Sequence, residues 1–201
     1  MCLGFRVHSG WGVMVAVGCQ SGRWQVLERR RMSVVDGKVA GHAQPYHFAR
    51  EQPLAQARKH LACCAAASVR LAREGLQEVV EKLSREHRVK GAAVLLGSGR
   101  PLPDLERILA SHPLIHTAEG EFFRKAFSEA CEALGVPVTG IREKELEQRA
   151  QAVFRKSAGA LPKELAAAAK HLGPPWGQDQ KAAALAAAVV LGGAGRWHNS
   201  E

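Results

Sequence analysis

The sequence predicts an α/β protein with a mixed five-stranded sheet, for three reasons. The first 35 residues contain three β-rich segments separated by short turns, which is typical of an antiparallel meander. A long alanine-rich segment with helical periodicity follows. The rest of the chain alternates helical segments with two short apolar strands, and this order favours parallel strands with helices on the faces of one sheet.

The predicted meander consists of residues 3–7, 11–17 and 24–35. Ser21 and Gly22 lie between the second and third segments, where a hairpin needs a permissive backbone. The second part of the chain, residues 52–87, has its apolar residues at helical spacing, and we expect Gly75 to divide it into two helices.

The third part begins with a buried strand near residues 91–96 and continues with a short helix at 104–112. A longer helix is predicted at 117–135, with Thr117 as its N-cap and Gly135 at its end. A second strand at 136–141 follows. Three more helices are expected, at 143–156, 162–173 and 179–193.

The last of these helices is almost entirely apolar, so it must be buried on most of its surface. Burial against the sheet is one way to achieve this, and packing against a second copy in a homodimer is another. We expect residues 1–191 to form one domain and residues 192–201 to form a flexible tail.

Composition narrows the class of protein further. The chain has 201 residues, of which 46% are hydrophobic, so it can bury a substantial core. It contains no apolar run of the roughly 18 residues that a membrane span requires, so no membrane partner is expected. Its five cysteines are odd in number and lack metal-site spacing, which favours a reducing, cytoplasmic compartment.

The positive charge of the chain is concentrated in its first half. Residues 1–100 contain 16 Lys and Arg against 7 Asp and Glu, whereas residues 101–201 contain 12 of each kind. The strongest local cluster is Arg29–Arg31. This asymmetry favours an anionic partner, either nucleic acid or a phosphorylated ligand, although plain solvation of a helix and a hairpin is the alternative. The low aromatic content of 5% supplies few stacking surfaces for single strands.

Three stretches resemble the RuvC-type Holliday-junction resolvases of the ribonuclease H-like fold. "LGFRVHSGWGVMVAV" is similar to the opening strand, glycine turn and second strand of that family. "GEFFRKAFSEACEALGVPVTGIREKELEQRAQAVF" resembles its helix, following strand and next helix, and "PPWGQDQKAAALAAAVVL" resembles its closing helix. The resemblance covers about three quarters of the chain, and the order of elements is that of a ribonuclease H-like sheet.

The resemblance implies nucleases that cut phosphodiesters with two divalent cations, held by carboxylates on the first strand, the fourth strand and the last helix. Here the first strand offers Arg6 or His8 where an aspartate is expected, and the fourth strand has no glutamate. Only Asp179, at the start of the last helix, remains. Because two cations need several negative charges, we expect a diverged domain without two-metal nuclease activity.

The densest polar stretch is "LIHTAEGEFFRKAF", residues 114–127, and we expect it to begin beside the end of the fourth strand. One expectation is that Glu119 and Asp179, with His116, bind one divalent cation there, with magnesium and manganese as candidates. The alternative is that Glu119 acts as a general base oriented by His116. The residues expected to complete this site as ligands are His8, Ser9 and His47.

A simpler interpretation of this stretch is the capped start of a helix. In that case Thr117 caps the helix, Glu119 and Glu121 complement its dipole, and Glu121 pairs with Lys125. A separate candidate ligand is Arg100, which follows a Gly-Ser-Gly turn and would contact a phosphate there; a plain turn that ends a strand is the alternative.

Three functions therefore remain open on the sequence. The first is a ribonuclease H-like domain that binds nucleic acid or another anionic ligand without cutting it. The second is a metal-dependent enzyme, a nuclease or a phosphoester hydrolase, with a relocated site around His116, Glu119 and Asp179. The third is a structural or oligomeric protein.

Overall fold

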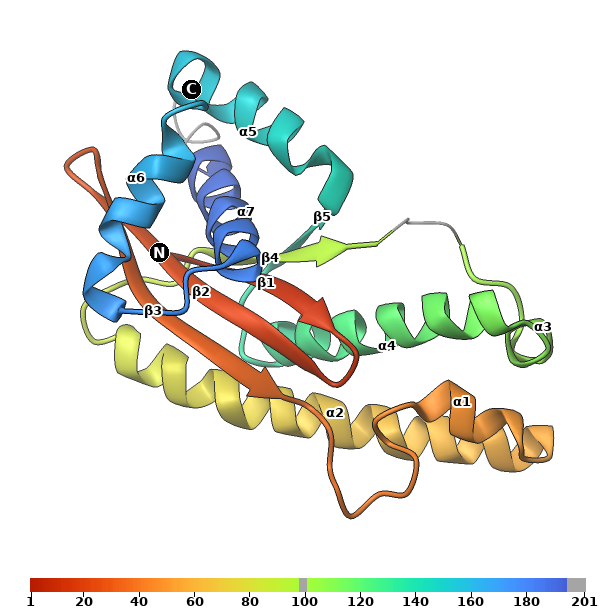
Figure 1. Ribbon diagram of the computed structural model, residues 1–201. Helices are drawn as coiled ribbons and strands as arrows, with labels where there is room; N and C mark the ends of the chain where they lie inside the picture. Colours follow the sequence, from red (N-terminus) through yellow and green to blue (C-terminus); the bar gives the residue numbers. More distant parts are fainter. Residues whose placement is uncertain (98–100, 195–201) are drawn as a thin grey trace.

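The computed structural model describes residues 1–97 and 101–194, and it confirms the predicted mixed five-stranded sheet. The strands lie in the order β3-β2-β1-β4-β5. β1 (Cys2–His8) pairs antiparallel with β2 (Trp11–Gln20), which pairs antiparallel with β3 (Arg23–Ser33). β4 (Gly91–Leu96) runs parallel to β1, and β5 (Val138–Arg142) runs parallel to β4. β1 is therefore the central strand, at the junction of the antiparallel and parallel halves (Figure 1).

Helices cover both faces of this sheet (Figure 1). One face is covered by α2 (Leu54–Leu83) and α4 (His112–Ala133), which also pack on each other. The other face is covered by α7 (Gln178–Ala194), with α5 (Leu146–Phe154) and α6 (Leu161–Ala168) packed against it. The remaining helical segments are short: α1 (Pro45–Arg50), α3 (Leu105–Leu109), and the single turns η1 (Glu143–Glu145), η2 (Arg155–Ser157) and η3 (Lys170–Leu172).

Two apolar layers form the core. The layer beneath α2 and α4 is built from alternate residues of the sheet and from large helix side chains, including Phe5, Met14, Leu76, Phe123 and Phe127. The opposite layer is made of smaller residues, because α7 supplies mainly alanines to it. The period-two alternation of β1 and β2 thus assigns successive residues to different layers, and it fixes which residues of these strands can reach α7.

Gly75 does not divide the long helix as the sequence predicted. α2 continues through it for 30 residues. A Cβ on Gly75 would lie 2.7 Å from the terminal methyl of Met32, so the missing side chain allows β3 and α2 to approach each other. Tertiary packing at this glycine therefore outweighs its low helix propensity.

The apolar helix α7 is buried within the chain itself. Its residues Ala183, Ala184 and Ala187 are fully buried against β1 and β2, so its composition needs no second copy to explain it. The helix is described as far as Ala194, and the division into a domain of residues 1–191 and a tail of residues 192–201 stays a prediction. In the described part of the chain no helix, α7 included, combines the length and the apolarity that a membrane crossing requires.

A buried histidine ties the loop after β3 to α2. His42 is 1% exposed, and its Nε2 lies 2.8 Å from Ser68 Oγ, which itself donates to the carbonyl of Val34. The Nδ1 atom of His42 accepts a hydrogen bond from the amide of Asp36. The neutral Nε2–H tautomer satisfies all of these contacts, and a second ring proton at Nδ1 would oppose the Asp36 amide. Burial lowers the pKa of His42 below its ordinary value of 6.5.

We expect this histidine to make the protein less stable in acid. Since its folded-state pKa lies below 6.5, the unfolded chain binds more protons between the two values, and stability falls as the pH drops below 6.5. The measurement is the urea midpoint at several pH values between neutral and mildly acidic, for the wild type and His42→Asn. The His42→Asn variant should be less stable than the wild type at neutral pH, but its urea midpoint should fall less on acidification. A His171→Asn control, changed at an exposed histidine, should keep the wild-type slope, and equal slopes in all three proteins would contradict the assignment.

Candidate functional site

The carboxyl ends of the parallel strands gather four charged or titratable residues. Arg6 and His8 lie in the last part of β1, and Glu143 follows β5 directly. Asp179 lies in the first turn of α7, which packs across the sheet at this point. In open α/β sheets this edge is where ligands commonly bind, so these residues form the first candidate site.

An arginine forms the centre of this site. Arg6 Nη1 donates to Asp179 Oδ1 at 2.8 Å, and Arg6 Nη2 lies 2.7 Å from Glu143 Oε1. The arginine side chain is only 18% exposed, so the pair is shielded more than an ordinary surface ion pair. One guanidinium thus joins the end of β5 to the start of α7 through the central strand.

These residues do not fit two divalent cations. A two-metal site needs several carboxylates free to ligate, because hard cations require negatively charged oxygen ligands. Here both carboxylates, Asp179 and Glu143, face the Arg6 guanidinium. The neighbouring strand β4 consists of glycine, alanine, valine and leucine only. The resemblance implied one aspartate on the first strand, at position 6 or 8, and these positions carry Arg6 and His8.

An aromatic and cationic stack borders the same site. The ring of His8 stacks on Trp11 with centroids 4.3 Å apart and planes inclined by 16°. The guanidinium carbon of Arg31 lies 4.1 Å from the Trp11 ring centroid, in cation–π contact. Trp11, Arg29, Arg31 and Asp179 are among the residues that line a cavity of about 360 Å³.

His8 is oriented by this stack more than by the carboxylate next to it. Its Nε2 atom lies 3.1 Å from Asp179 Oδ1, which is close enough for an ion pair. The geometry is nevertheless outside the hydrogen-bond range, and within the described residues this buried nitrogen has no hydrogen-bond partner. A buried polar atom without a hydrogen bond is uncommon in native proteins.

Arg29 holds the segment that leads into α7. Its guanidinium donates to the carbonyls of Gly173, Pro174 and Pro175, and more distantly to that of Leu172. Through these contacts β3 positions the loop before Asp179. Arg31 lies two residues further along the same face of β3 and is exposed. Its guanidinium packs on Trp11 and lines the cavity.

A second polar group lies between α1 and α4. Glu119 is 2% exposed, and its Oε1 accepts hydrogen bonds from the amides of Tyr46 and His47 at 3.2 Å each. His47 Nδ1 lies 3.0 Å from the same oxygen. The rings of His112 and His116 pack against that of His47. Burial, and to a lesser degree the Glu119 carboxylate, raise the pKa of Tyr46.

The predicted site residues therefore separate into two groups. His116 and Glu119 come together with His47, as the sequence interpretation grouped them. Asp179 and His8 lie instead with Arg6 at the end of the sheet. Ser9 is exposed in the turn between β1 and β2. The remaining predicted ligand, Arg100, and the turn residues 98 and 99 before it lie outside the described residues.

The helix that carries Glu119 begins earlier than the sequence predicted. α4 starts at His112 with Pro113 in its first turn, where a proline is favoured because its missing amide proton has no helical partner there. Thr117 is consequently not the N-cap, and its hydroxyl donates to the Pro113 carbonyl inside the helix. The α4 start lies against α1 and α3, away from the sheet rather than beside the end of β4 (Figure 1). Glu121 pairs with Arg124, not with the predicted Lys125.

Sequence reasoning missed several residues of both groups. His112 carries a usable signal, because "HPLIH" separates it from His116 by four residues, which is one helical turn. Glu143 and Trp11 carry no comparable signal, whereas Arg31 belongs to the basic cluster that the sequence already shows. Their positions depend on which strand ends meet in space, which spacing along the chain does not reveal.

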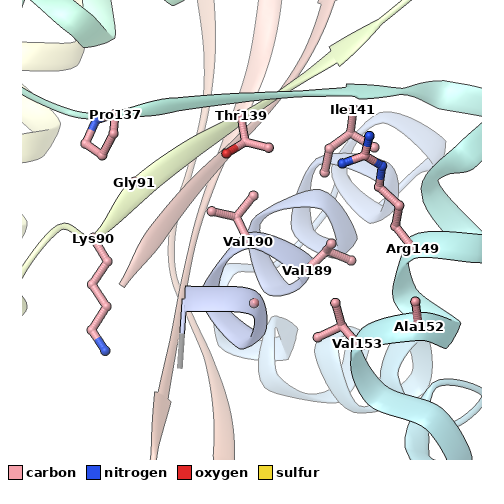
Figure 2. Close-up of a pocket in the computed structure, with 11 residues that line it drawn as sticks. Lys90, Gly91, Pro137, Thr139, Ile141, Arg149, Ala152, Val153, Val189 and Val190 are labelled. Carbon is pink, nitrogen blue, oxygen red and sulfur yellow. The ribbon is translucent and has the colours of Figure 1, made fainter. Parts of the chain in front are cut away.

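An apolar pocket of about 560 Å³ lies at the other side of the sheet edge, between β5, α5 and α7 (Figure 2). Figure 2 shows Ile141, Val153, Val189 and Val190 around the space, while the side chain of Lys90 extends away from it. The walls offer few polar groups that would orient a ligand. For this reason it is a weaker candidate than the two polar groups.

The buried cysteines are not reactive. Cys2, Cys64 and Cys131 are buried, and burial raises their pKa values to about 11, about 11 and about 12. A thiol with such a pKa is almost wholly protonated at neutral pH, and the thiolate is the nucleophile and metal ligand. Burial therefore disfavours the reactive thiolate at these three positions.

Comparison with known proteins supports the fold reading. No protein-family model matches the chain, and no curated protein matches it significantly. Among solved structures, it is similar to Thermus thermophilus RuvC in complex with a Holliday junction substrate, with a TM-score of 0.52 and 14% identity over 97% of this chain and 94% of that one. A second Thermus thermophilus RuvC structure gives a TM-score of 0.50 and 13% identity over 98% and 96%.

The similarity extends over nearly the whole of both chains, although few residues are identical. The chain therefore has the ribonuclease H-like fold of RuvC.

Proposed function

We propose that this chain binds nucleic acid at the carboxyl end of its sheet and does not cut it by two-metal chemistry. The observation that carries the proposal is the Arg6 guanidinium held between Asp179 and Glu143. It occupies the place where a nuclease of this fold would gather carboxylates around cations. An arginine in place of metal-bound carboxylates removes the means of activating a water molecule. It leaves the site open to a ligand that carries phosphate.

The positive charge around the site supports an anionic ligand. Arg31 is exposed, and with Arg29 it lines the cavity of about 360 Å³ beside Trp11. Arginine guanidinium groups are suited to phosphates, because their planar fork of donors matches phosphate geometry. The solved RuvC structure with a Holliday junction substrate supports branched DNA as the first ligand to test.

The test compares two adjacent arginines of β3 that point to opposite faces. Arg31 contacts Trp11 at the site, whereas Arg30 pairs with Glu78 of α2 on the other face. Arg31→Ala and Arg30→Ala make the same change in net charge, so they separate a local contact from the overall attraction of a basic protein. Binding is measured by fluorescence anisotropy with labelled four-way junction, duplex and single-stranded DNA over a range of salt concentrations.

We expect the wild type to bind with an affinity that falls as salt rises, because phosphate contacts release counterions. Arg31→Ala should weaken binding severalfold and reduce the magnitude of the log–log salt slope by about 1, the effect of one lost phosphate contact. Arg30→Ala should leave the slope close to the wild-type value. Equal loss in the two variants, or no binding by the wild type, would contradict the proposed interface.

A further inference from the structure

Three histidine rings converge between α1 and α4, outside the site at the sheet edge. His47 comes from α1, and His112 and His116 come from the first two turns of α4. Each offers one ring nitrogen, and these three atoms all lie within 4.8 Å of one another. The Nε2 atoms of His112 and His116 are 2.9 Å apart. Within the described residues this is the one group of histidine, cysteine and carboxylate side chains with such convergence.

The two helical histidines are arranged by the helix itself. Four residues separate them, so their side chains lie on one face, one turn apart. Without an ion, two imidazole nitrogens that face each other at 2.9 Å can share only one proton between them. An ion between them would use both lone pairs at once.

The third histidine is oriented by a buried carboxylate. Glu119 Oε1 lies 3.0 Å from His47 Nδ1, and the same oxygen accepts the backbone amide of His47. Because a carboxylate accepts hydrogen bonds, Nδ1 carries the ring proton, and the lone pair is left on Nε2. A carboxylate that fixes the tautomer of a histidine in this way is the usual outer partner of a metal-bound imidazole.

We propose that His47, His112 and His116 bind a zinc ion through their Nε2 atoms, with Glu119 as the positioning residue for His47. Imidazole nitrogens suit zinc and related transition metals, whereas magnesium prefers oxygen. Two nitrogens bound to one tetrahedral zinc at about 2.0–2.1 Å lie roughly 3.3 Å apart, so the His112–His116 pair needs to open only slightly.

Three protein ligands leave the fourth position of a tetrahedral ion available to water or another small ligand. His112 and His116 are exposed, so that position faces solvent. The ion would also join α1 to α4, because its ligands come from both helices. The site stands apart from the proposed nucleic-acid interface, since it shares no residue with it.

The test is zinc binding by tag-free protein, because an affinity tag of histidines would bind zinc by itself. The zinc affinity is measured by competition with a chromophoric chelator, with magnesium in excess. Variants His112→Ala and His116→Ala each remove one exposed ligand, so neither should disturb the fold, which circular dichroism checks. His171→Ala is the matched control, because His171 is an exposed histidine outside the cluster.

We expect one zinc per chain in the wild type and in His171→Ala, and at least a tenfold weaker affinity in His112→Ala and His116→Ala. Glu119→Gln should weaken zinc binding about 10- to 100-fold, which is the usual effect of removing an outer-shell partner. Addition of zinc should also slow amide exchange in α1 of the wild type, and this effect should disappear in His116→Ala.

Zinc affinity that is unchanged in both His112→Ala and His116→Ala would overturn the proposal, as would equal weakening in His171→Ala. Absence of zinc binding by the wild type would overturn it as well. These outcomes leave the nucleic-acid proposal untouched, because that proposal is measured by salt-dependent DNA binding of Arg31 and Arg30 variants.

Discussion

Replacing Gly4 with alanine is expected to lower the free energy of unfolding by about 3 kcal/mol or more, because the new methyl group meets the backbone of α7. A Cβ at Gly4 would lie 1.9 Å from the carbonyl oxygen of Ala183 and 2.9 Å from the amide nitrogen of Ala187. Neither atom belongs to a flexible side chain, so the whole helix would have to move off the central strand. For a chain of this size such a loss lowers the melting temperature by roughly 10 °C.

The displacement of α7 would also reach the candidate site. Asp179 lies in the first turn of this helix, and its contact with Arg6 depends on the helix lying across β1. The measurement is thermal unfolding followed by circular dichroism. Gly37→Ala is the matched control, because no atom lies within 4 Å of the added Cβ there and its effect should stay within about 0.5 kcal/mol. A Gly4→Ala protein as stable as that control would contradict the close packing of α7 on β1.

Arg6→Asp is the second change with a large expected effect. It removes the cation that Asp179 and Glu143 share and adds a third carboxylate beside them. In metal-free buffer the repulsion among three carboxylates, together with the lost ion pairs, should lower stability by about 3 kcal/mol or more. Magnesium should restore part of this loss, since clustered carboxylates are the ligands it prefers.

Thermal unfolding with chelator and with millimolar magnesium measures both effects. Arg6→Ala separates them, because it removes the ion pairs without adding a ligand and should therefore gain less from magnesium. Arg30→Asp makes the same charge change on the opposite face, beside Glu78. If magnesium stabilised the wild type as much as Arg6→Asp, Arg6 would not be what keeps cations out of the site.

The sequence predicts the architecture well because periodicity and element order are local signals. The apolar, β-rich segments of β1, β2 and β4 are readable directly, and their order is enough to indicate a mixed sheet. The sequence also shows that Arg6 or His8 stands where a carboxylate is expected, because this needs only the resemblance to the family. What the sequence does not contain is the partner of each charge: the contact of Arg6 with Glu143 joins residues 137 positions apart, and only the folded sheet brings them together.

The errors around α4 have a physical cause as well. Thr117 followed by glutamates has the pattern of a helix start, but Pro113 is equally compatible with one, and the packing of α1 and α3 favours the earlier start. Glu119 then lies in the third turn and faces α1. The burial of Glu119 beside His47 could not be predicted, because His47 belongs to helix α1 and lies 72 residues earlier in the chain.

We expect this ribonuclease H-like domain to bind nucleic acid without two-metal cleavage, and one experiment tests both parts of this expectation. Labelled four-way junction is incubated with the wild type in magnesium and then in manganese, and each sample is divided between a native and a denaturing gel. We expect a retarded complex on the native gel and full-length strands on the denaturing gel with either cation. Shortened strands that form with magnesium or manganese, but not in a parallel sample with chelator, would show a metal-dependent nuclease and contradict the absence of two-metal cleavage. Intact strands without a retarded complex would contradict nucleic-acid binding.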